Sequence, residues 1–460
     1  MPILSLLKGT PARLGALAEH LRMSFWFVPA LMSAGAALLA LVSLAVDNAL
    51  SDELLSGLEW VYGGGPEGAR SLLSTVASSA ITVAGTTFSI TIAALSLASS
   101  QFGPRLLRNF VRDRGNQMVL GTFVATFLYC LLVVRTVRGL EDSRVVPHLS
   151  VTIGVLLAIA NLLVLIYFIH HIAMSIRADQ VIAAVGHDLD GAIQQLFPEQ
   201  LGQGLVAQAG EPEAPAPPPA AAPGATPIAL DHDGYLQVLD VETLMGLATE
   251  RDLVVTLLRR PGDFVVADEP VALAWPAEHV DAAVCDSVRA ALILGGERSS
   301  QQDVRFVINQ LVEVAARALS PGINDPFTAV TCLDRLGAML CRVARRPLPD
   351  GRRYDDEGRL RVVAEPIRFD ELVDGAFDQI RVYGRDNLVV MGRLFDTLGR
   401  VGAATEAEWR RAPLLRQARL AYEGSREALP TDGDRQTLEE RYQATLATLN
   451  SEARALGKPD

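Results

Sequence analysis

Lysine is almost absent from this 460-residue sequence: the only lysines are Lys8 and Lys458, and all other basic residues are arginine. This excludes a phosphate-binding loop lysine, a Schiff-base lysine and a biotin or lipoyl attachment site from the interior of the chain. Histidine is also missing after His279, so the C-terminal part has no imidazole base or ligand. No GxSxG, HExxH or metal-ligand spacing is present. We therefore expect no catalytic residues, no cofactor, no metal and no enzymatic activity.

Paired cysteines and an excess of positive charge are missing as well. No CxxC spacing or zinc pattern occurs among the four cysteines, which are Cys130, Cys285, Cys332 and Cys341. This pattern predicts free, buried thiols in a reducing compartment. The net charge of −12 argues against a nucleic-acid partner, which would require a basic face.

Charged residues are absent from the interiors of four long apolar runs, apart from Arg135 near the end of the third. Each run has the length of roughly 20 residues that a helix needs to cross a bilayer. The sequence therefore predicts an α-helical membrane protein with four transmembrane helices. The predicted transmembrane domain is 24–174, with spans at 24–46, 71–100, 118–137 and 149–172.

The loops between these spans predict their orientation. The N-terminal segment 1–23 and the connection between the second and third spans are rich in arginine, whereas the connection between the first and second spans is acidic. Positive loops face the cytoplasm. We therefore expect a bacterial inner-membrane protein whose N-terminus and C-terminal domain are both cytoplasmic. The arginines of the second connection could form a cytoplasmic mouth; they are Arg105, Arg108, Arg112 and Arg114.

The second span carries small and weakly polar residues along one face. At about 100° per residue, these side chains form one stripe, whereas the bulky residues occupy the rest of the circumference. The candidate stripe residues are Ser71, Thr75, Ser78, Thr82, Gly85, Thr86, Ser89 and Ser96, with Ala93 and Ser100 on the same face. One interpretation is close helix packing, and the other is the lining of a pore in a symmetric oligomer. In the fourth span, Asn161 is expected to bond to a neighbouring helix.

The sequence after the spans predicts a cytoplasmic α+β part. We expect a juxtamembrane amphipathic helix (175–208), a Pro/Ala linker (209–230), a small β module (231–277) and a helical domain (278–460). The linker is too rich in proline and alanine to bury a core. The β module alternates β-branched runs with turn residues, and 347–366 is expected to be a charged loop.

One phrase in the helical domain, SPGINDPFTA, has the residues of a helix end and a helix start. Pro321 and Gly322 end one helix, and Asn324 or Asp325 can cap the next. The alternative is a contact motif for a ligand or a subunit, in which Asn324 and Asp325 act with Arg305 and Arg317.

Several phrases carry a resemblance to a known family. They are ITVAGTTFSITIAALSLASSQFGPRLLRNFVRDRGNQ, GTFVATFLYCLLVVRTV, VPHLSV, IYFIHHIA and ALSPGINDPFTA. The chain resembles the bacterial predicted membrane proteins grouped as domain of unknown function 2254. The resemblance implies a multi-pass bacterial membrane protein and supplies no catalytic or binding residue.

Three functions stay open on the sequence. The leading hypothesis is a homo-oligomeric, channel-like conduit for an ion or small solute, lined by the second span and assembled or gated by the cytoplasmic domain. The alternative is a membrane-anchored scaffold or sensor whose cytoplasmic domain binds a partner or ligand. The third is a membrane enzyme that uses carboxylates of the helical domain. In each case the lipid bilayer is the expected partner.

Overall fold

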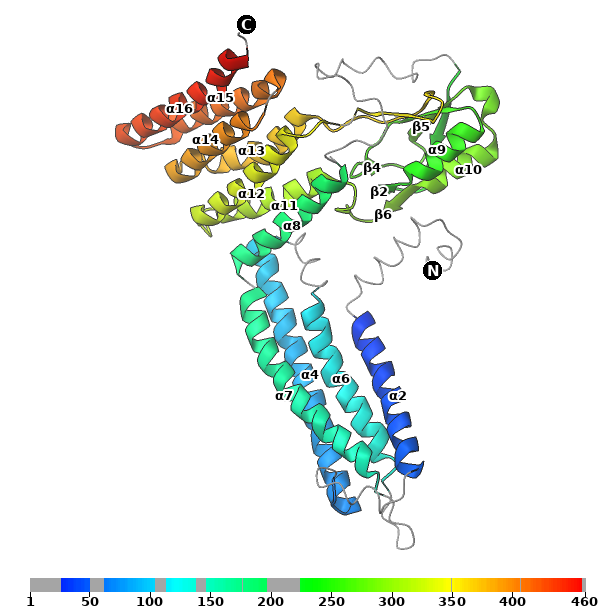
Figure 1. Ribbon diagram of the computed structural model, residues 1–460. Coiled ribbons are helices and arrows are strands. Elements are labelled where there is room, and N and C mark those ends of the chain that lie inside the picture. The colour runs from blue at the N-terminus through cyan, green and yellow to red at the C-terminus, as the bar shows by residue number, and fades with distance from the viewer. Residues whose placement is uncertain are drawn as a thin grey trace. The chain divides into compact units, whose positions relative to one another are not determined.

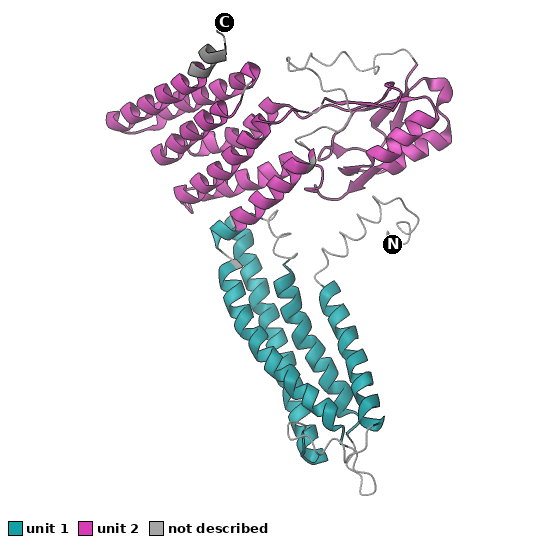
Figure 2. Ribbon diagram, in the orientation of Figure 1, with its two compact units in different colours: residues 1–180 teal, residues 181–460 magenta. Residues whose placement is uncertain are grey.

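A computed structural model of the protein describes residues 26–49, 62–103, 113–137, 146–175, 177–196, 224–348, 350–405 and 407–456 (Figure 1). The chain divides into two compact units, residues 1–180 and 181–460 (Figure 2).

Unit 1 is a bundle of four long helices. They are α2 (Phe27–Ala49), α4 (Pro66–Phe102), α6 (Arg114–Val134) and α7 (His148–Ser175). All four are long and apolar enough to cross a membrane, and each overlaps one of the four predicted spans. The helix α4 extends beyond the second predicted span, since it already begins at Pro66, a residue suited to the first turn of a helix.

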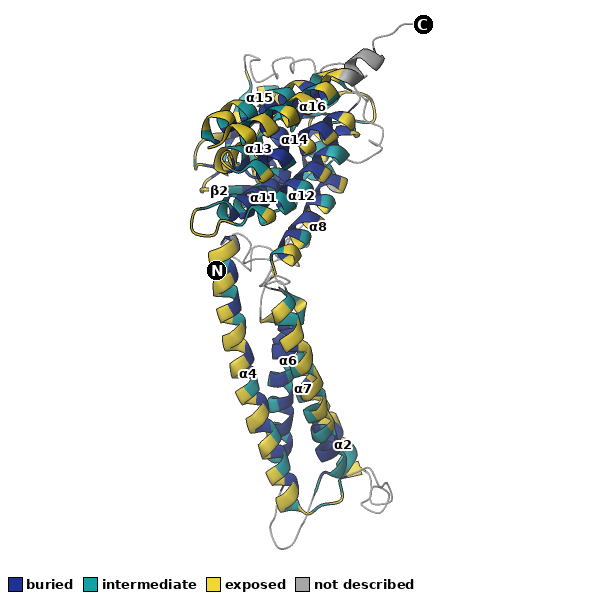
Figure 3. Cartoon of the chain, turned by 90° about the vertical axis from the view of Figure 1, so that its left-hand side faces the viewer, coloured by how far each residue is buried: buried dark blue, intermediate teal, exposed yellow. Residues whose placement is uncertain are grey.

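The helices of unit 1 bury small and aromatic residues and expose leucine and isoleucine. Phe123, Tyr129 and Phe168 are buried between the helices, with α6 packed against α2, α4 and α7. Leu38 and Leu163 are instead exposed on the outside of the bundle, and exposed residues run along the length of α4 in Figure 3. A surface of large apolar side chains fits lipid rather than water.

Unit 2 begins within the first turn of α8 (Ala178–Leu196), whose apolar face is buried at Val185, Leu189 and Ile193. This helix packs on α12 (Pro326–Ala344): Asp190 forms an ion pair with Arg342, and Arg346 donates a hydrogen bond to the carbonyl of Ile193. The predicted juxtamembrane helix is thus part of the helical packing of unit 2. Its predicted end, 197–208, lies outside the described residues.

The sheet part of unit 2 contains two sheets and two helices. The five-stranded sheet has the order β1 (Thr226–Ala229), β5 (Pro270–Trp275), β3 (Val254–Leu257), β8 (Leu360–Val363) and β7 (Arg352–Tyr354). The three-stranded sheet has the order β4 (Phe264–Val265), β2 (Gly234–Leu239) and β6 (Leu292–Gly295). The pair β3 and β8 is parallel, and the other pairs are antiparallel.

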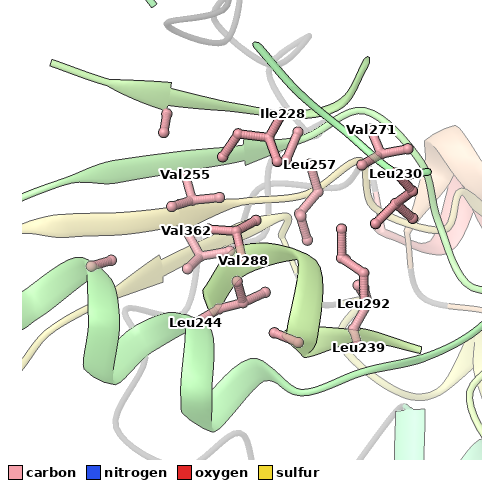
Figure 4. Close-up of a cluster of buried hydrophobic side chains, with 14 of the residues drawn as sticks. Ile228, Leu230, Leu239, Leu244, Val255, Leu257, Val271, Val288, Leu292 and Val362 are labelled. Atoms are coloured by element: carbon pink, nitrogen blue, oxygen red, sulfur yellow. The ribbon is translucent and has the colours of Figure 1, made fainter. Parts of the chain in front are cut away.

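The core of this part lies between the sheets and the helices α9 (Val241–Glu250) and α10 (Ala282–Ala291). Figure 4 shows Leu244 and Val288 from the helices meeting Val255 and Val362 from neighbouring strands. The short helix η4 (Ala277–His279) follows β5.

The predicted small β module needs three corrections. The linker prediction extended to 230, but β1 already pairs with β5 from Thr226; residues 209–223 lie outside the described residues. The module contains the helix α9 within the predicted interval 231–277, and it continues beyond this interval with α10 and β6. The expected loop 347–366 supplies β7 and β8, because long-range pairing with β3 overrides its high local charge.

The rest of unit 2 is helical, as expected. Its helices are α11 (Val304–Ala318), α12, α13 (Phe369–Tyr383), α14 (Leu388–Ala403), η5 (Glu408–Arg410), α15 (Arg411–Ala428) and α16 (Asp432–Leu456). The helix α15 begins at Arg411, directly after the short helix η5.

Candidate functional site

The stripe on α4 lies on the outside of the bundle formed by one chain. Every stripe residue from Ser71 to Ser96 is exposed, as judged from the described part of the chain. At about 100° per residue, the buried face of α4 lies opposite the stripe. The two faces of α4 therefore have separate roles.

The buried face of α4 is a row of small residues. Ala77, Ala84, Ala94 and Ala98 are buried where α6 and α7 pack against α4. Alanine allows helix backbones to approach closely in a membrane. Close packing inside one chain is therefore made by alanines, and the predicted packing role of the stripe would apply only to contacts with something outside the chain.

The hydroxyl groups of the stripe are satisfied by the helix itself. Thr82 donates to the carbonyl oxygen of Ser78 at 2.7 Å, Thr86 donates to that of Thr82 at 3.1 Å, and Ser89 donates to that of Gly85 at 2.9 Å. Such bonds to the preceding turn remove the cost of an unpaired hydroxyl in lipid. The oxygen atoms still give this face of α4 its polarity.

The predicted bond of Asn161 to a neighbouring helix is confirmed. The hydroxyl of Thr126 on α6 lies 3.2 Å from the side-chain oxygen of Asn161 on α7, and both side chains are buried. Thr126 also lies 2.9 Å from the carbonyl oxygen of Thr122. Asn161 thus joins two helices in the interior of the bundle.

A polar cluster joins the start of α6 to the end of α7. The carboxylate of Asp113 accepts a hydrogen bond from the backbone N–H of Gly115 at 2.7 Å and pairs with Nε2 of His171 at 2.6 Å. The ring of Tyr167 stacks on that of His171. A Cβ at position 115 would lie 2.7 Å from Nε2 of His171, so glycine keeps this contact open.

The predicted arginine mouth is described only in part. Arg114, the first residue of α6, is exposed. The other three candidates lie outside the described residues; they are Arg105, Arg108 and Arg112.

Asn324 and Asp325 end one helix and start the next. Asn324 adopts a left-handed conformation with φ of 50°, and Asp325 caps α12 by accepting hydrogen bonds from the backbone and the hydroxyl of Thr328. The structural interpretation of this motif is confirmed. The four residues of the contact hypothesis are not brought together, because Arg305 lies in the first turn of α11, whereas the motif follows its end.

A polar pocket that the sequence interpretation missed lies within unit 2. It has a volume of about 240 Å³ and lies between the Pro261–Asp263 turn, α11 and α13. The lining residues are Gly262, Asp263, Arg298, Arg305, Ile308, Asn309, Glu371 and Gly375. Nothing local in the sequence shows that the turn and the start of α11 meet.

Both signs of charge line this pocket. Arg305 pairs with Asp263 at 2.9 Å, and Arg298 pairs with the buried Asp303 at 2.6 Å. Burial raises the pKa of Asp303, although the charge of Arg298 acts in the opposite direction. Gly262 has φ of 92°, and a Cβ there would overlap the carboxylate of Asp303, so this turn requires glycine.

The cysteines are free, as predicted. Cys130 and Cys332 are buried, whereas Cys285 and Cys341 are half-buried, so the prediction of burial holds for two of the four. Burial raises the pKa of Cys332 and makes its thiolate scarce. Among the described residues, no group of three or more His, Cys, Asp or Glu side chains could hold a metal ion.

Four helices apolar enough to cross a membrane, joined to a second unit of sheets and helices, define a membrane protein with two folded units. The chain belongs to the family described as "Predicted membrane protein (DUF2254)", whose model matches residues 22–400. The match confirms the family that the sequence phrases indicated.

Relatives occur in mycobacteria. Uncharacterized proteins of Mycobacterium bovis and Mycobacterium tuberculosis are each 32% identical to the chain over 429 residues, which cover 91% of this chain and 80% of the relative. No solved structure matches the chain.

Proposed function

We propose that the protein is a homo-oligomeric membrane conduit in which α4 of each chain lines a shared pathway. The observation that carries the proposal is the exposed hydroxyl stripe on α4, opposite the alanine row that packs inside the chain. Thr82, Thr86 and Ser89 offer oxygen atoms to a permeating ion without burying a charge.

A pathway between chains fits the packing of the bundle better than one through a single chain. Phe123, Tyr129 and Phe168 fill the interior between the helices. A stripe on the outer surface can enclose water only when several copies surround an axis. The arginines between the second and third spans, of which Arg114 is described, would then form the mouth of the pathway. Because positive loops face the cytoplasm, this mouth would be cytoplasmic.

Single-channel recording of the purified full-length protein in planar bilayers tests this function. We expect discrete conductance whose amplitude or ion selectivity changes in Thr82→Leu and Ser89→Leu. The matched control is Phe88→Leu, which changes an exposed residue of α4 outside the stripe and should conduct like the wild type. Silence from folded, oligomeric protein, or equal changes in stripe and control variants, would reject the conduit.

The subunit number is a separate measurement that the proposal must also pass. Native mass spectrometry of the protein released from mild detergent should report a closed oligomer. A monomer at all protein concentrations would contradict the conduit, because one stripe encloses no pathway.

The polar pocket favours a second function, a membrane-anchored sensor. Its two arginines and two carboxylates suit a small zwitterion such as an α-amino acid. A panel of amino acids should then raise the thermal unfolding midpoint of the full-length protein. Gly375→Leu, which fills the pocket beside Ile308, should abolish that rise. In a sensor of this kind, Thr82→Ala and Thr86→Ala should leave function intact.

A further inference from the structure

Large apolar side chains are exposed at one end of the helical part of unit 2. Phe327 has 71% of its surface exposed, and four other large apolar residues are exposed at the same end of the helical part. We define the apolar end by Ile323, Phe327, Val382, Tyr383 and Val389. Ile323 lies in the connection between α11 and α12, and the other four lie in helix turns next to this connection or to that between α13 and α14.

The two connections lie at the same end of the helical part because α12 and α14 run parallel. Asp334 of α12 pairs with Arg393 of α14, and Gly337 faces Thr397 one turn further along both helices. The first turns of the two helices therefore lie together. Phe327 and Val389 accordingly line one groove of about 370 Å³, along with Arg393 and Arg441.

The apolar end is also the end at which the chain enters unit 2. The helix α8 runs parallel to α12, because contacts further along α8 are made to residues further along α12. Gly186 faces Arg335, Asp190 pairs with Arg342, and the carbonyl of Ile193 accepts a hydrogen bond from Arg346. The start of α8 therefore lies toward the start of α12.

The covalent chain limits how far the start of α8 can be from the bilayer. The span α7 ends at Ser175 and α8 begins at Ala178, a step that reaches at most about 10 Å. Because α7 is long and apolar enough to cross a membrane, the start of α8 must lie close to a lipid surface.

The chemistry of the apolar end suits the headgroup region of a bilayer. Aromatic and aliphatic side chains such as Phe327 and Val389 can enter the boundary between headgroups and acyl chains. Tyr383 fits the same layer, since tyrosine concentrates at membrane interfaces. The positive N-terminal ends of α12 and α14 favour anionic headgroups, whereas Arg393 and Arg441 in the groove are paired with Asp334 and Asp396.

From these observations we propose that the apolar end inserts into the headgroup region of the same bilayer that the chain spans. The contact would hold unit 2 on the membrane through side chains far from α8 in the sequence. The inference does not rest on the conduit, since it uses only unit 2 and its covalent link to α7.

Tryptophan quenching in nanodiscs tests the contact with the full-length protein. Phe327→Trp places a reporter on the apolar end, and Phe264→Trp places a matched reporter at an exposed phenylalanine of β4. Lipids brominated at the headgroup end of their acyl chains quench tryptophan only at close range. After subtraction of the wild-type signal, we expect quenching at position 327 that is several-fold greater than at position 264.

Two outcomes would overturn the proposal. Equal, weak quenching at both positions with a red emission maximum would show that position 327 faces water. A blue-shifted but unquenched signal at position 327 would show that protein, such as a second copy of the chain, covers the apolar end instead. Circular dichroism and the thermal midpoint of each variant confirm that the substituted protein is folded.

Discussion

The carboxylate of Asp47 at the end of α2 caps the first turn of α7 through Ser150. Oδ2 of Asp47 accepts hydrogen bonds from the backbone N–H of Ser150 at 2.9 Å and from its hydroxyl at 2.6 Å. Oδ1 accepts a further bond from the N–H of Leu149 at 2.9 Å. The hydroxyl of Tyr129 donates to the carbonyl of Ser150, so one cluster joins α2, α6 and α7.

Replacement of Asp47 should loosen the bundle at this end. Asp47→Ala leaves two backbone N–H groups of α7 unpaired, and we expect a loss of about 1–2 kcal/mol in the free energy of unfolding. Thermal unfolding of the full-length protein in detergent measures the change. The control is Glu67→Gln in the exposed first turn of α4, which should leave the midpoint nearly unchanged. An equal effect of both variants would contradict the capping role.

The bond between Thr126 and Asn161 should be energetically modest. Polar pairs in membranes contribute about 0.6 kcal/mol on average and rarely more than about 1.7 kcal/mol. A double-mutant cycle of Thr126→Val and Asn161→Leu, followed by unfolding in detergent, measures the coupling energy. Strict additivity of the two substitutions would show that the side chains do not interact in the folded protein.

An acid-sensitive contribution to stability should come from Asp252. The hydrogen bond and charge of Arg361, whose Nη1 lies 2.7 Å from Oδ1 of Asp252, lower the pKa of this carboxyl. Because the pKa of Asp252 is lower in the folded than in the unfolded protein, its ionised carboxylate stabilises the fold. This stabilisation is fully present above the pKa of the unfolded state, about 3.9, and is lost as the pH falls through the pKa of the folded state.

The variant Arg361→Gln tests this dependence. Thermal midpoints between about pH 6 and pH 3 should fall less steeply in Arg361→Gln than in the wild type, because the pKa of Asp252 returns toward its ordinary value. The control Arg416→Gln removes an exposed pair with Asp374 and should keep the wild-type slope. Identical slopes in all three proteins would reject the assignment.

The membrane helices could be predicted from the sequence because the signal is local. A run of apolar residues of sufficient length forms a helix in lipid whatever its neighbours are. The bond of Asn161 was predictable for the same reason, since a lone amide inside a span needs a partner. The capping role of Asp47 was not predictable, because it depends on α7 lying beside the end of α2.

Nonlocal contacts also explain what was missed in unit 2. Arg361 has only 3% of its surface exposed, although the charge of its segment led to the prediction of a loop. Its burial follows from the bond to Asp355 within the β7–β8 hairpin and from the bond to Asp252, which the parallel pairing of β3 and β8 brings close. The polar pocket has the same origin, because the Gly262 turn and the start of α11 are separated along the chain.

A buried arginine of η5 that contacts the end of α12 leads to the last prediction. Arg410 is 7% exposed and donates hydrogen bonds to the carbonyl oxygens of Ala344 at 2.6 Å and Arg346 at 2.9 Å. Its guanidinium also lies 5.6 Å from the ring centre of Phe369. Burial lowers the pKa of Arg410, so the surrounding carbonyls must offset the cost of its charge.

Arg410→Met removes these donors and leaves the carbonyls at the end of α12 without a partner. We expect a loss of about 1–3 kcal/mol in the free energy of unfolding, measured by chemical denaturation of the full-length protein. Arg410→Lys should restore only part of the loss, because a single ammonium cannot reproduce the planar fork that reaches both carbonyls. The exposed Arg419→Lys serves as the control and should be neutral. Full stability of Arg410→Met would mean that water or other groups satisfy the end of α12, and that the charge of Arg410 is not needed there.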